Sequence, residues 1–245
     1  MDSSMITGAT LVVGADSDIG SKLIESLEGD VLAHYFISKD IIDGIKNERV
    51  VITPVFGDLS SSESILNFIS HLKETRKTVS RIVHLPSSPA IPNRITKFSP
   101  ERYLREINIQ VVSAAMILKE FLPMMAKKRF GRIAVALTSY CIGAPPKYLT
   151  EYVSTKYALM GLMKSIAVEY AGKGITVNAV APSMTDTKFL STLPDFEIAA
   201  AAKVHPMGRN ATPDDIVKIL QLLLADEIEY TTGAIIPITG GISFF

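Results

Sequence analysis

The stretch TLVVGADSDIGSKLIESL, residues 10–27, joins an apolar β-branched run to a segment of helical period through a turn with two glycines. Gly14 ends the expected strand and Gly20 lies at the start of the expected helix. At such a junction, backbone N–H groups and the positive end of the helix face the same point beyond the strand. The turn therefore predicts a nucleotide phosphate site, formed by Gly14, Ser17, Asp18, Ile19 and Gly20.

Asp18 stands where a third glycine would suit this turn. An aspartate is a good N-cap, because its carboxylate accepts from N–H groups of the first helical turn. We therefore expect Asp18 to cap the helix and to weaken phosphate binding without abolishing it. Gly8, which begins a similar pattern, precedes the strand and so lies at its wrong end.

Short apolar runs alternate with segments of helical period along the whole chain. Near-continuous apolar strands between amphipathic helices are typical of a parallel sheet covered on both faces. Right-handed crossovers then give an α/β fold, a doubly wound, Rossmann-like, three-layer α/β/α sandwich. We expect a single domain over residues 1–245. The expected strands are 9–14, 30–36, 49–55, 80–85, 132–137, 174–180 and 233–239, and the expected helices are 18–28, 60–75, 100–127, 150–172 and 213–225, with a weaker helical pattern at 38–47.

Composition narrows the class of protein. The 25 basic and 25 acidic side chains balance, which gives no indication of a nucleic-acid or membrane partner. The single cysteine excludes an internal disulfide and fits a reducing compartment, so we expect a cytoplasmic protein. The apolar runs are shorter than the ~20 residues of a membrane helix. The histidines lack the spacing of metal ligands, so no metal site is expected.

Tyr152 and Lys156 are four residues apart in a segment of helical period, so their side chains share one face. An ammonium beside a phenol lowers the phenol pKa from about 10, which makes the tyrosine a usable acid or base. Tyr35 and Lys39 have the same spacing, but Tyr35 lies on an expected strand. The spacing alone is therefore weak evidence of chemistry.

The companions of this pair carry a resemblance. Ser139 ends an expected strand thirteen residues before Tyr152, and Asn108 lies in the expected helix 100–127. With the glycine turn, this order resembles the Asn–Ser–Tyr–Lys tetrad of the short-chain dehydrogenase/reductase family. The resemblance implies that Tyr152 exchanges a proton with the substrate oxygen and Ser139 hydrogen-bonds that oxygen. It implies that Lys156 binds the nicotinamide ribose and lowers the phenol pKa, while Asn108 holds a water in a proton relay.

The resemblance extends to the nucleotide. It implies that Asp58 and Leu59, after the third strand, contact the nucleotide. Considered without the resemblance, Asp58 could equally be a helix N-cap. Pro182, Thr185 and Thr187 would face the nicotinamide, and residues 183–210 would form a substrate lid. The second strand ends in HYFISK without an acid, whereas Ser38 and Lys39 suit a phosphate. Asp16 and Asp18 add negative charge to the glycine turn, which opposes a phosphate. On balance the sequence favours NADP(H) over NAD(H).

The sequence also departs from the family pattern. Residues 84–87 read HLPS where the family has Asn-Asn-Ala-Gly, and Pro86 lacks an N–H. We therefore expect a different local network, with His84 in a structural role. Val13, Asp18 and Ser183 replace a Thr and two Gly residues of the family motifs.

Within the family, MMAKKRFGRI and EYAGKGITVNAVAP look like the 3-oxoacyl-acyl-carrier-protein reductases. That resemblance implies a 3-oxoacyl thioester substrate, carrier-protein docking at Arg129 and Lys173, and a homotetramer. Arg129 and Lys173 also read as ordinary surface cations near helix ends. Two alternatives stay open: a reductase or dehydrogenase of another small ketone or alcohol, and a catalytically silent nucleotide-binding sensor or scaffold.

Overall fold

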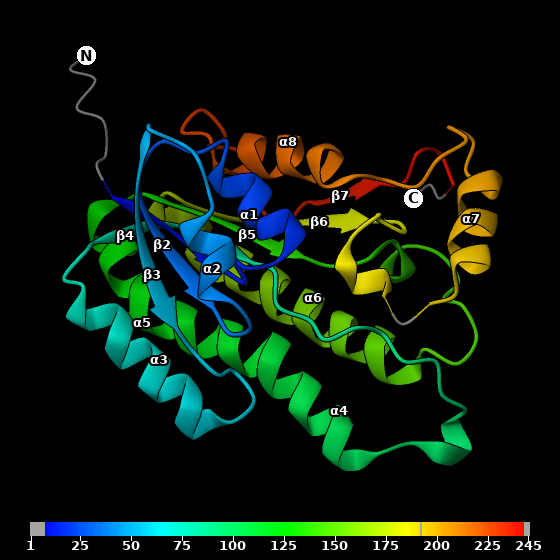
Figure 1. The fold of residues 1–245 in the computed structure, drawn as a ribbon. Helices are drawn as coiled ribbons and strands as arrows, with labels where there is room; N and C mark the ends of the chain where they lie inside the picture. Colours follow the sequence, from blue (N-terminus) through cyan, green and yellow to red (C-terminus); the bar gives the residue numbers. More distant parts are fainter. Residues whose placement is uncertain (1–7, 192, 243–245) are drawn as a thin grey trace.

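The computed structural model describes residues 8–191 and 193–242. Its centre is a parallel sheet of seven strands in the order β3-β2-β1-β4-β5-β6-β7, and helices cover both faces (Figure 1). This is the doubly wound, Rossmann-like sandwich expected from the sequence. The strands are β1 Ala9–Val13, β2 Gly29–Tyr35, β3 Val50–Phe56, β4 Val79–His84, β5 Gly131–Ala136, β6 Ile175–Pro182 and β7 Ile235–Ile238.

The apolar strands form because both of their faces are covered. All five residues of β1 are buried, and seven of the eight residues of β6 are buried. One core cluster includes Leu11, Ile117 and Val177, while the other includes Val12, Leu220 and Val180. Neighbouring residues of one strand thus enter opposite layers, as the strand period of two requires.

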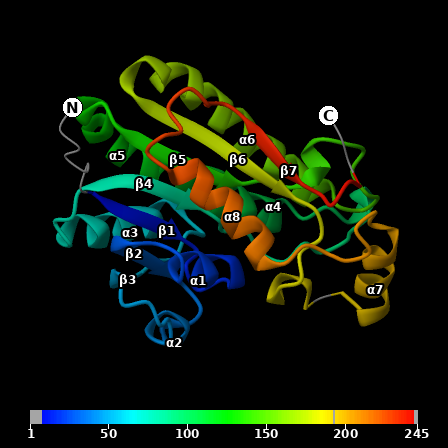
Figure 2. The same cartoon turned by 90° about the horizontal axis from the view of Figure 1, so that it is seen from above.

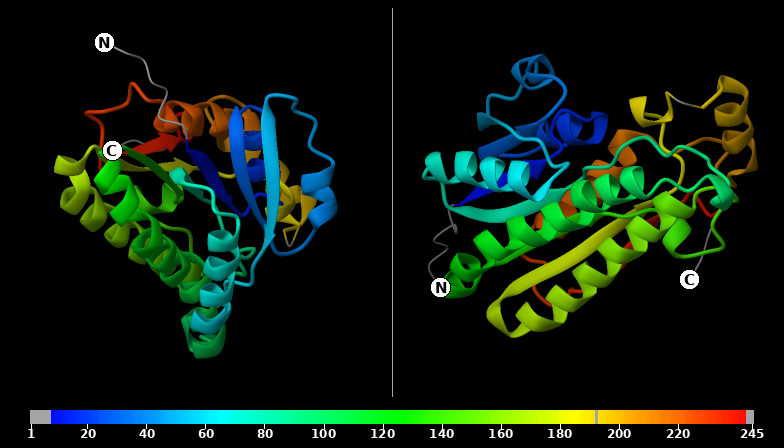
Figure 3. Two further views of the ribbon diagram at one scale, coloured as in Figure 1. Left: turned by 90° about the vertical axis from the view of Figure 1, so that its left-hand side faces the viewer. Right: turned by 90° about the horizontal axis from the view of Figure 1, so that it is seen from below.

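The two helical layers are distinct in Figures 1 and 2. α1 and α8 pack against each other on one face, while α3, α5 and α6 cover the other (Figure 2). Seen from below, α4, α5 and α6 run across that second face (Figure 3, right). The helices are α1 Asp18–Ile24, α2 Lys39–Asp43, α3 Ser62–Glu74, α4 Pro100–Ile107, α5 Ser113–Lys128, α6 Thr150–Tyr170, α7 Asp195–Val204 and α8 Pro213–Leu224.

The helix expected over 100–127 is present as Pro100–Lys128, but its geometry is not uniform. A π-helical turn, Asn108–Val112, separates α4 from α5. The stretch Pro100–Lys128 is 29 residues long and apolar enough to cross a membrane by length and composition, which the count of apolar runs in the sequence does not indicate. In the fold, however, Ile117, Leu122 and Met125 of α5 are buried in the core against the sheet.

The order of the strands reverses between β1 and β4. Connections from these two strands leave in opposite directions, and this is where a doubly wound fold has its ligand crevice. Gly14 follows β1 at this point, beside Leu85 and Pro86, which follow β4. The expected phosphate turn is therefore in the place that the topology provides.

Candidate active site

The turn after β1 is shaped by its two glycines. Gly14 has a positive φ of 82°, which favours glycine. A Cβ on Gly20 would lie 2.3 Å from the Gly14 carbonyl oxygen, so no larger residue fits there without moving the backbone. The Ser17 hydroxyl donates to the Gly14 carbonyl at 2.7 Å and accepts from the Gly20 N–H at 3.0 Å.

The expectation that Asp18 caps α1 is wrong. Ser17 is the N-cap, and Asp18 is the first helical residue. The Asp18 carboxylate instead accepts from the backbone N–H of Lys188 at 2.6 Å. It therefore ties the glycine turn to the segment that follows β6.

Asp16 is a residue whose contacts the sequence did not indicate. One oxygen of its carboxylate, Oδ2, accepts from the backbone N–H groups of Phe36 at 3.1 Å, Ile37 at 2.7 Å and Ser38 at 3.3 Å. These three N–H groups belong to the turn after β2. Lys39, which the sequence offered for a phosphate, pairs with Asp43 at 3.1 Å.

His34 joins the carboxyl ends of three strands. Its Nδ1 accepts from the Gly14 N–H at 2.9 Å, and its Nε2 lies 3.0 Å from the Gly57 carbonyl after β3. These partners require a neutral ring with its proton on Nε2. Burial lowers the pKa of His34 to about 4, which keeps the ring neutral.

The expected contacts after β3 divide into two groups. Asp58 accepts from the N–H and the hydroxyl of Ser60, while Ser61 caps α3, so the N-cap interpretation of Asp58 is wrong. The side chain of Leu59 is buried in the core. The Asn108 amide donates to the Ser60 carbonyl at 2.9 Å, which places this amide on the β3 side of the site.

The three other members of the expected tetrad come from two neighbouring elements. Ser139 begins a 3₁₀ turn, Ser139–Cys141, just beyond β5, and its side chain is buried. Tyr152 and Lys156 lie one turn apart in α6, with the Lys156 Nζ 5.8 Å from the centre of the Tyr152 ring. Lys156 is buried and donates to the Ala136 carbonyl at the end of β5 at 2.9 Å.

The expected effect of Lys156 on the phenol is not what the structure shows. Burial raises the pKa of Tyr152, and a hydrogen bond with the Thr138 side chain opposes this rise only in part. Burial also lowers the pKa of Lys156 to about 8. Desolvation disfavours the charged form of each group and is the largest cause of both pKa shifts. The phenol therefore keeps its proton at neutral pH.

Glu106 and Gln110 form a polar network beside this pair. Gln110 is buried, and its amide donates to the Glu106 carboxylate at 2.9 Å and to the Ser87 hydroxyl at 3.1 Å. The Ser88 N–H also donates to Glu106. The charge of Glu106 raises the pKa of both Tyr152 and Lys156. The sequence prediction missed both residues.

The amide of Gln110 thus lies where the polar groups of α4, the loop after β4 and α6 converge. Its Oε1 is buried without a partner among the described residues. The π-helical turn sets this orientation, because it widens the helix between Asn108 and Gln110. Gln110 is therefore buried, whereas the amide of Asn108 bonds to the Ser60 carbonyl.

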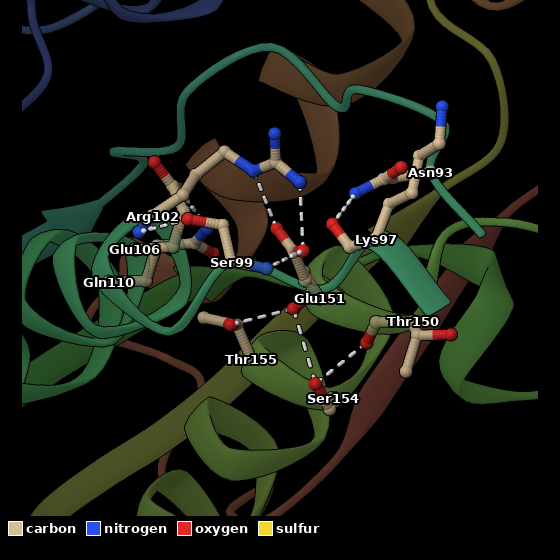
Figure 4. A network of polar contacts seen from close by, with 10 residues as sticks. All are labelled: Asn93, Lys97, Ser99, Arg102, Glu106, Gln110, Thr150, Glu151, Ser154 and Thr155. Carbon is tan, nitrogen blue, oxygen red and sulfur yellow. Dashed lines mark hydrogen bonds and ion pairs between the residues drawn. The ribbon is translucent and has the colours of Figure 1, made fainter. Parts of the chain in front are cut away.

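Arg102 and Glu151 fix the start of α6 against α4 (Figure 4). The guanidinium donates to both carboxylate oxygens of Glu151, at 2.6 Å and 2.8 Å, and the Ser99 N–H adds a third bond. Hydrogen bonding to Arg102 lowers the pKa of Glu151. Because Tyr152 is the residue after Glu151, this bidentate contact helps to position the phenol.

The segment after β6 approaches the site from the other side. Pro182 ends β6, and the side chains of Thr185 and Thr187 bond to carbonyl groups of the same segment. Phe189 lies 6.2 Å from the Tyr152 ring, centre to centre. The expected lid 183–210 also contains α7, which stands away from the sheet in Figure 1.

His84 is packed and hydrogen-bonded, as expected of a structural histidine. It is buried at the end of β4, with Nε2 3.0 Å from the Ser113 hydroxyl. Burial lowers its pKa to about 3, and the charge of Lys156 adds to that effect. The loop after it bonds to Glu106 through the Ser88 N–H and to Gln110 through the Ser87 hydroxyl.

Arg129 and Lys173 lie far along the strands from Tyr152. They precede β5 and β6, whereas Ser139 follows β5, so they belong to the amino-terminal edge of the sheet. Arg129 bonds to the Gly172 carbonyl, and the Lys173 ammonium lies over the Tyr170 ring. Within one chain, the structure does not bring them together with the tetrad residues.

The turn after β1 fits a dinucleotide. The required absence of a Cβ at Gly20 and the positive φ of Gly14 are the features that allow such a turn to approach a phosphate closely. In residues 8–191 and 193–242, no group of three or more His, Cys, Asp and Glu side chains is placed to hold a metal ion.

Comparison with known proteins supports the interpretation of the turn after β1 as part of a dinucleotide site. The family model described as enoyl-(acyl carrier protein) reductase matches residues 33–243. The 3-oxoacyl-[acyl-carrier-protein] reductase FabG of Thermotoga maritima is 27% identical over 240 residues, which are 95% of this chain and 96% of that protein.

Two solved structures share the fold. A 3-oxoacyl (acyl-carrier-protein) reductase from Agrobacterium tumefaciens with NADP bound has a TM-score of 0.82 and 23% identity, over 96% of this chain and 93% of that one. A 3-oxoacyl-[acyl-carrier protein] reductase from Brucella melitensis with bound NAD also has a TM-score of 0.82, with 19% identity, over 99% and 93%. These structures show the shared fold, and the match to the family model shows that this chain belongs to the short-chain dehydrogenase/reductase family, close to the 3-oxoacyl-acyl-carrier-protein reductases.

Proposed function

We propose that this protein reduces a carbonyl group to a secondary alcohol with a nicotinamide nucleotide, and that the carbonyl belongs to a 3-oxoacyl thioester on an acyl carrier protein. The observation that carries the reaction class is the arrangement of Ser139, Tyr152 and Lys156 beyond the carboxyl end of β5. The substrate class rests on the similarity to 3-oxoacyl-acyl-carrier-protein reductases.

The state of the two titrating groups suits reduction. A phenol that keeps its proton can donate it to the substrate oxygen as the alcohol forms. Lys156, with a pKa of about 8, is mostly protonated near neutral pH and can return a proton to the phenolate. Ser139 would donate a hydrogen bond to the same substrate oxygen. The bound nucleotide supplies the hydride.

The residues proposed to hold the nucleotide lie on both sides of the crevice. The glycine turn would receive the phosphates, Asp58 would contact the adenine, and Tyr152 and Lys156 would contact the nicotinamide ribose. The segment after β6 would cover the nicotinamide. Leu59 is proposed to contribute only its backbone, because its side chain is buried in the core. These residues are Gly14, Ser17, Asp18, Ile19, Gly20, Asp58, Leu59, Tyr152, Lys156, Pro182, Thr185 and Thr187.

Asn108 is proposed to hold a water in the proton relay, and Gln110 is proposed as a second acceptor for such a water. Its buried Oε1 is a free acceptor that could hold a water. Residues 183–210 are proposed as the substrate lid of a single domain. The cytoplasm stays the expected location.

The oligomer and the docking surface remain proposals as well. Exposed apolar side chains on α4 and α6, namely Leu104, Tyr157 and Val168, favour the expected homotetramer. Carrier docking at Arg129 and Lys173 would require the carrier to approach from the amino-terminal edge of this sheet. Light scattering would check the tetramer.

The replacement Tyr152→Phe tests the proposed reaction. It removes only the phenolic oxygen, so turnover of a short 3-oxoacyl thioester should fall by about a thousandfold. Loss of the absorbance of the reduced nucleotide measures turnover, and calorimetry should show nucleotide binding nearly unchanged. Tyr157→Phe, one residue beyond Lys156 and exposed, is the matched control and should keep wild-type turnover.

The outcomes separate the alternatives. Turnover of another ketone with the same dependence on Tyr152 would keep the reaction and replace the substrate. Nucleotide binding without turnover of any carbonyl compound would favour the silent sensor or scaffold. Equal turnover in the wild type and in Tyr152→Phe would contradict the assigned role of the phenol.

A further inference from the structure

The turn after β2 already holds an anion that belongs to the chain itself. Three successive backbone N–H groups, those of Phe36, Ile37 and Ser38, converge on one carboxylate oxygen of Asp16. Successive N–H groups of this kind form a concave anion-binding nest. Because Asp16 fills the nest, its donors are not free for a second anion.

The position of this nest matters for the nucleotide. In a doubly wound fold, the adenosine ribose lies at the carboxyl end of the second strand. An acid there binds the 2′-hydroxyl of NAD, whereas a nearby arginine accommodates the 2′-phosphate of NADP. β2 of this chain ends at Tyr35, directly before the nest. Asp16 therefore brings an acid to this place from the glycine turn rather than from β2 itself.

The charges around the nest also oppose a phosphate. Lys39 is the single basic residue between Lys22 and Lys46, and its ammonium pairs with Asp43. The second oxygen of Asp16, Oδ1, has no partner among the described residues, since every bond of this carboxylate is made by Oδ2. A hydroxyl can donate to such an oxygen, while a phosphate dianion is repelled by it.

We propose that Asp16 sets the nucleotide preference of this protein towards NAD(H), by filling the N–H nest after β2 and presenting a carboxylate to the ribose 2′ position. This inference rests on the proposed nucleotide-dependent function. It replaces the preference for NADP(H) expected from the sequence, which gave Ser38 and Lys39 more weight than the negative charges of Asp16 and Asp18 and did not indicate that Asp16 bonds to the turn after β2.

Calorimetry of nucleotide binding tests the inference without any turnover. The wild type should bind NAD⁺ at least about tenfold more tightly than NADP⁺. Asp16→Asn keeps the size of the side chain and removes its charge, so it should reduce this ratio to within about threefold. Asp18→Asn is the matched control: it removes a charge from the same turn but not from the nest, and should change the affinity for both nucleotides alike.

A second measurement needs no variant. Adenosine 5′-monophosphate and adenosine 2′,5′-bisphosphate differ only by the 2′-phosphate, so the wild type should bind the monophosphate more tightly. Tighter binding of the bisphosphate or of NADP⁺, or a preference that Asp16→Asn leaves unchanged, would overturn the role of Asp16. Binding of neither dinucleotide would overturn the proposed function itself, on which the inference rests.

Discussion

The two halves of the crevice are stabilised in different ways. On the side of β1, β2 and β3, the polar groups are joined by hydrogen bonds: Asp16 to the turn after β2, Asp18 to Lys188, and His34 to Gly14 and Gly57. On the side of β5 and α6, Tyr152 and Lys156 are governed by burial, which is the largest cause of both pKa shifts.

This difference separates positioning from reactivity. A carboxylate or imidazole with its partners in place holds a loop in one conformation. A buried phenol or ammonium with few partners instead has its proton affinity moved towards the neutral form. The nucleotide half of this crevice is therefore a rigid frame, while the catalytic half contains the groups that are prepared to exchange protons.

The largest expected effect comes from adding a Cβ atom at Gly20, where the turn after β1 leaves no room for one. In Gly20→Ala, the new Cβ would lie 2.3 Å from the Gly14 carbonyl oxygen and 2.7 Å from the Ala15 Cα, so the backbone must move. We expect a loss of about 3 kcal/mol in the free energy of unfolding, measured in urea, and weaker nucleotide binding.

Gly161→Ala is the matched control for this substitution. Gly161 lies in α6, and a Cβ there meets no heavy atom within 4 Å. Alanine favours a helix over glycine by about 1 kcal/mol, so the control should stabilise the protein. Equal effects of the two substitutions would show that the turn is not the tight frame described above.

The second largest expected effect is a loss of folding stability in acid, caused by His34 on the side of β1, β2 and β3. Burial lowers the pKa of His34 from 6.5 to about 4, so the unfolded chain binds more protons than the folded one between these values. Stability is then lost as the pH falls through this range. The loss from His34 alone should be about 2 kcal/mol between pH 7 and pH 5.

Urea unfolding at several pH values measures this slope. His34→Gln should reduce the loss of stability between pH 7 and pH 5 by about 2 kcal/mol. The separate contribution of His84, whose pKa is also lowered by burial, should remain. His71→Gln changes an exposed histidine on α3 and should leave the slope unchanged. A slope that is the same in all three proteins would exclude His34 as an acid-sensitive element.

The smallest expected effect lies in the catalytic half. The charge of Glu106 raises the pKa of Lys156, which is otherwise lowered by burial. Glu106→Gln should lower that pKa further, so kcat/KM should begin to fall at a lower pH than in the wild type. The exposed Glu101→Gln on α4 serves as the control. An unchanged profile would mean that Glu106 does not influence the proton donor.

The fold could be predicted from the sequence because its central strands β1, β5 and β6 are buried on both faces. Such strands appear as unbroken apolar runs, and the helices between them show a separate period, so order and type of element follow directly. The expected strand 132–137 and the observed β5, Gly131–Ala136, differ by one residue at each end. Ser139, Tyr152 and Lys156 could be found because their positions depend only on β5 and α6.

The rest depended on directions that the sequence does not encode locally. The π-helical turn adds a residue to one turn of the helix, and the burial of Gln110 beside it could not be predicted from the apolar period. Asp16 meets residues 36–38 only through the pairing of β1 with β2. The pKa of Tyr152 follows from the burial of its surroundings, which a four-residue spacing cannot reveal.

The bond between Asp18 and Lys188 has a kinetic consequence. It joins residues that are 170 positions apart, one in the glycine turn and one in the segment after β6. That segment cannot swing outward without first breaking this bond, so opening of the crevice and release of the Lys188 amide hydrogen to solvent are one event. Native-state hydrogen exchange at this single amide would therefore count how often the crevice opens.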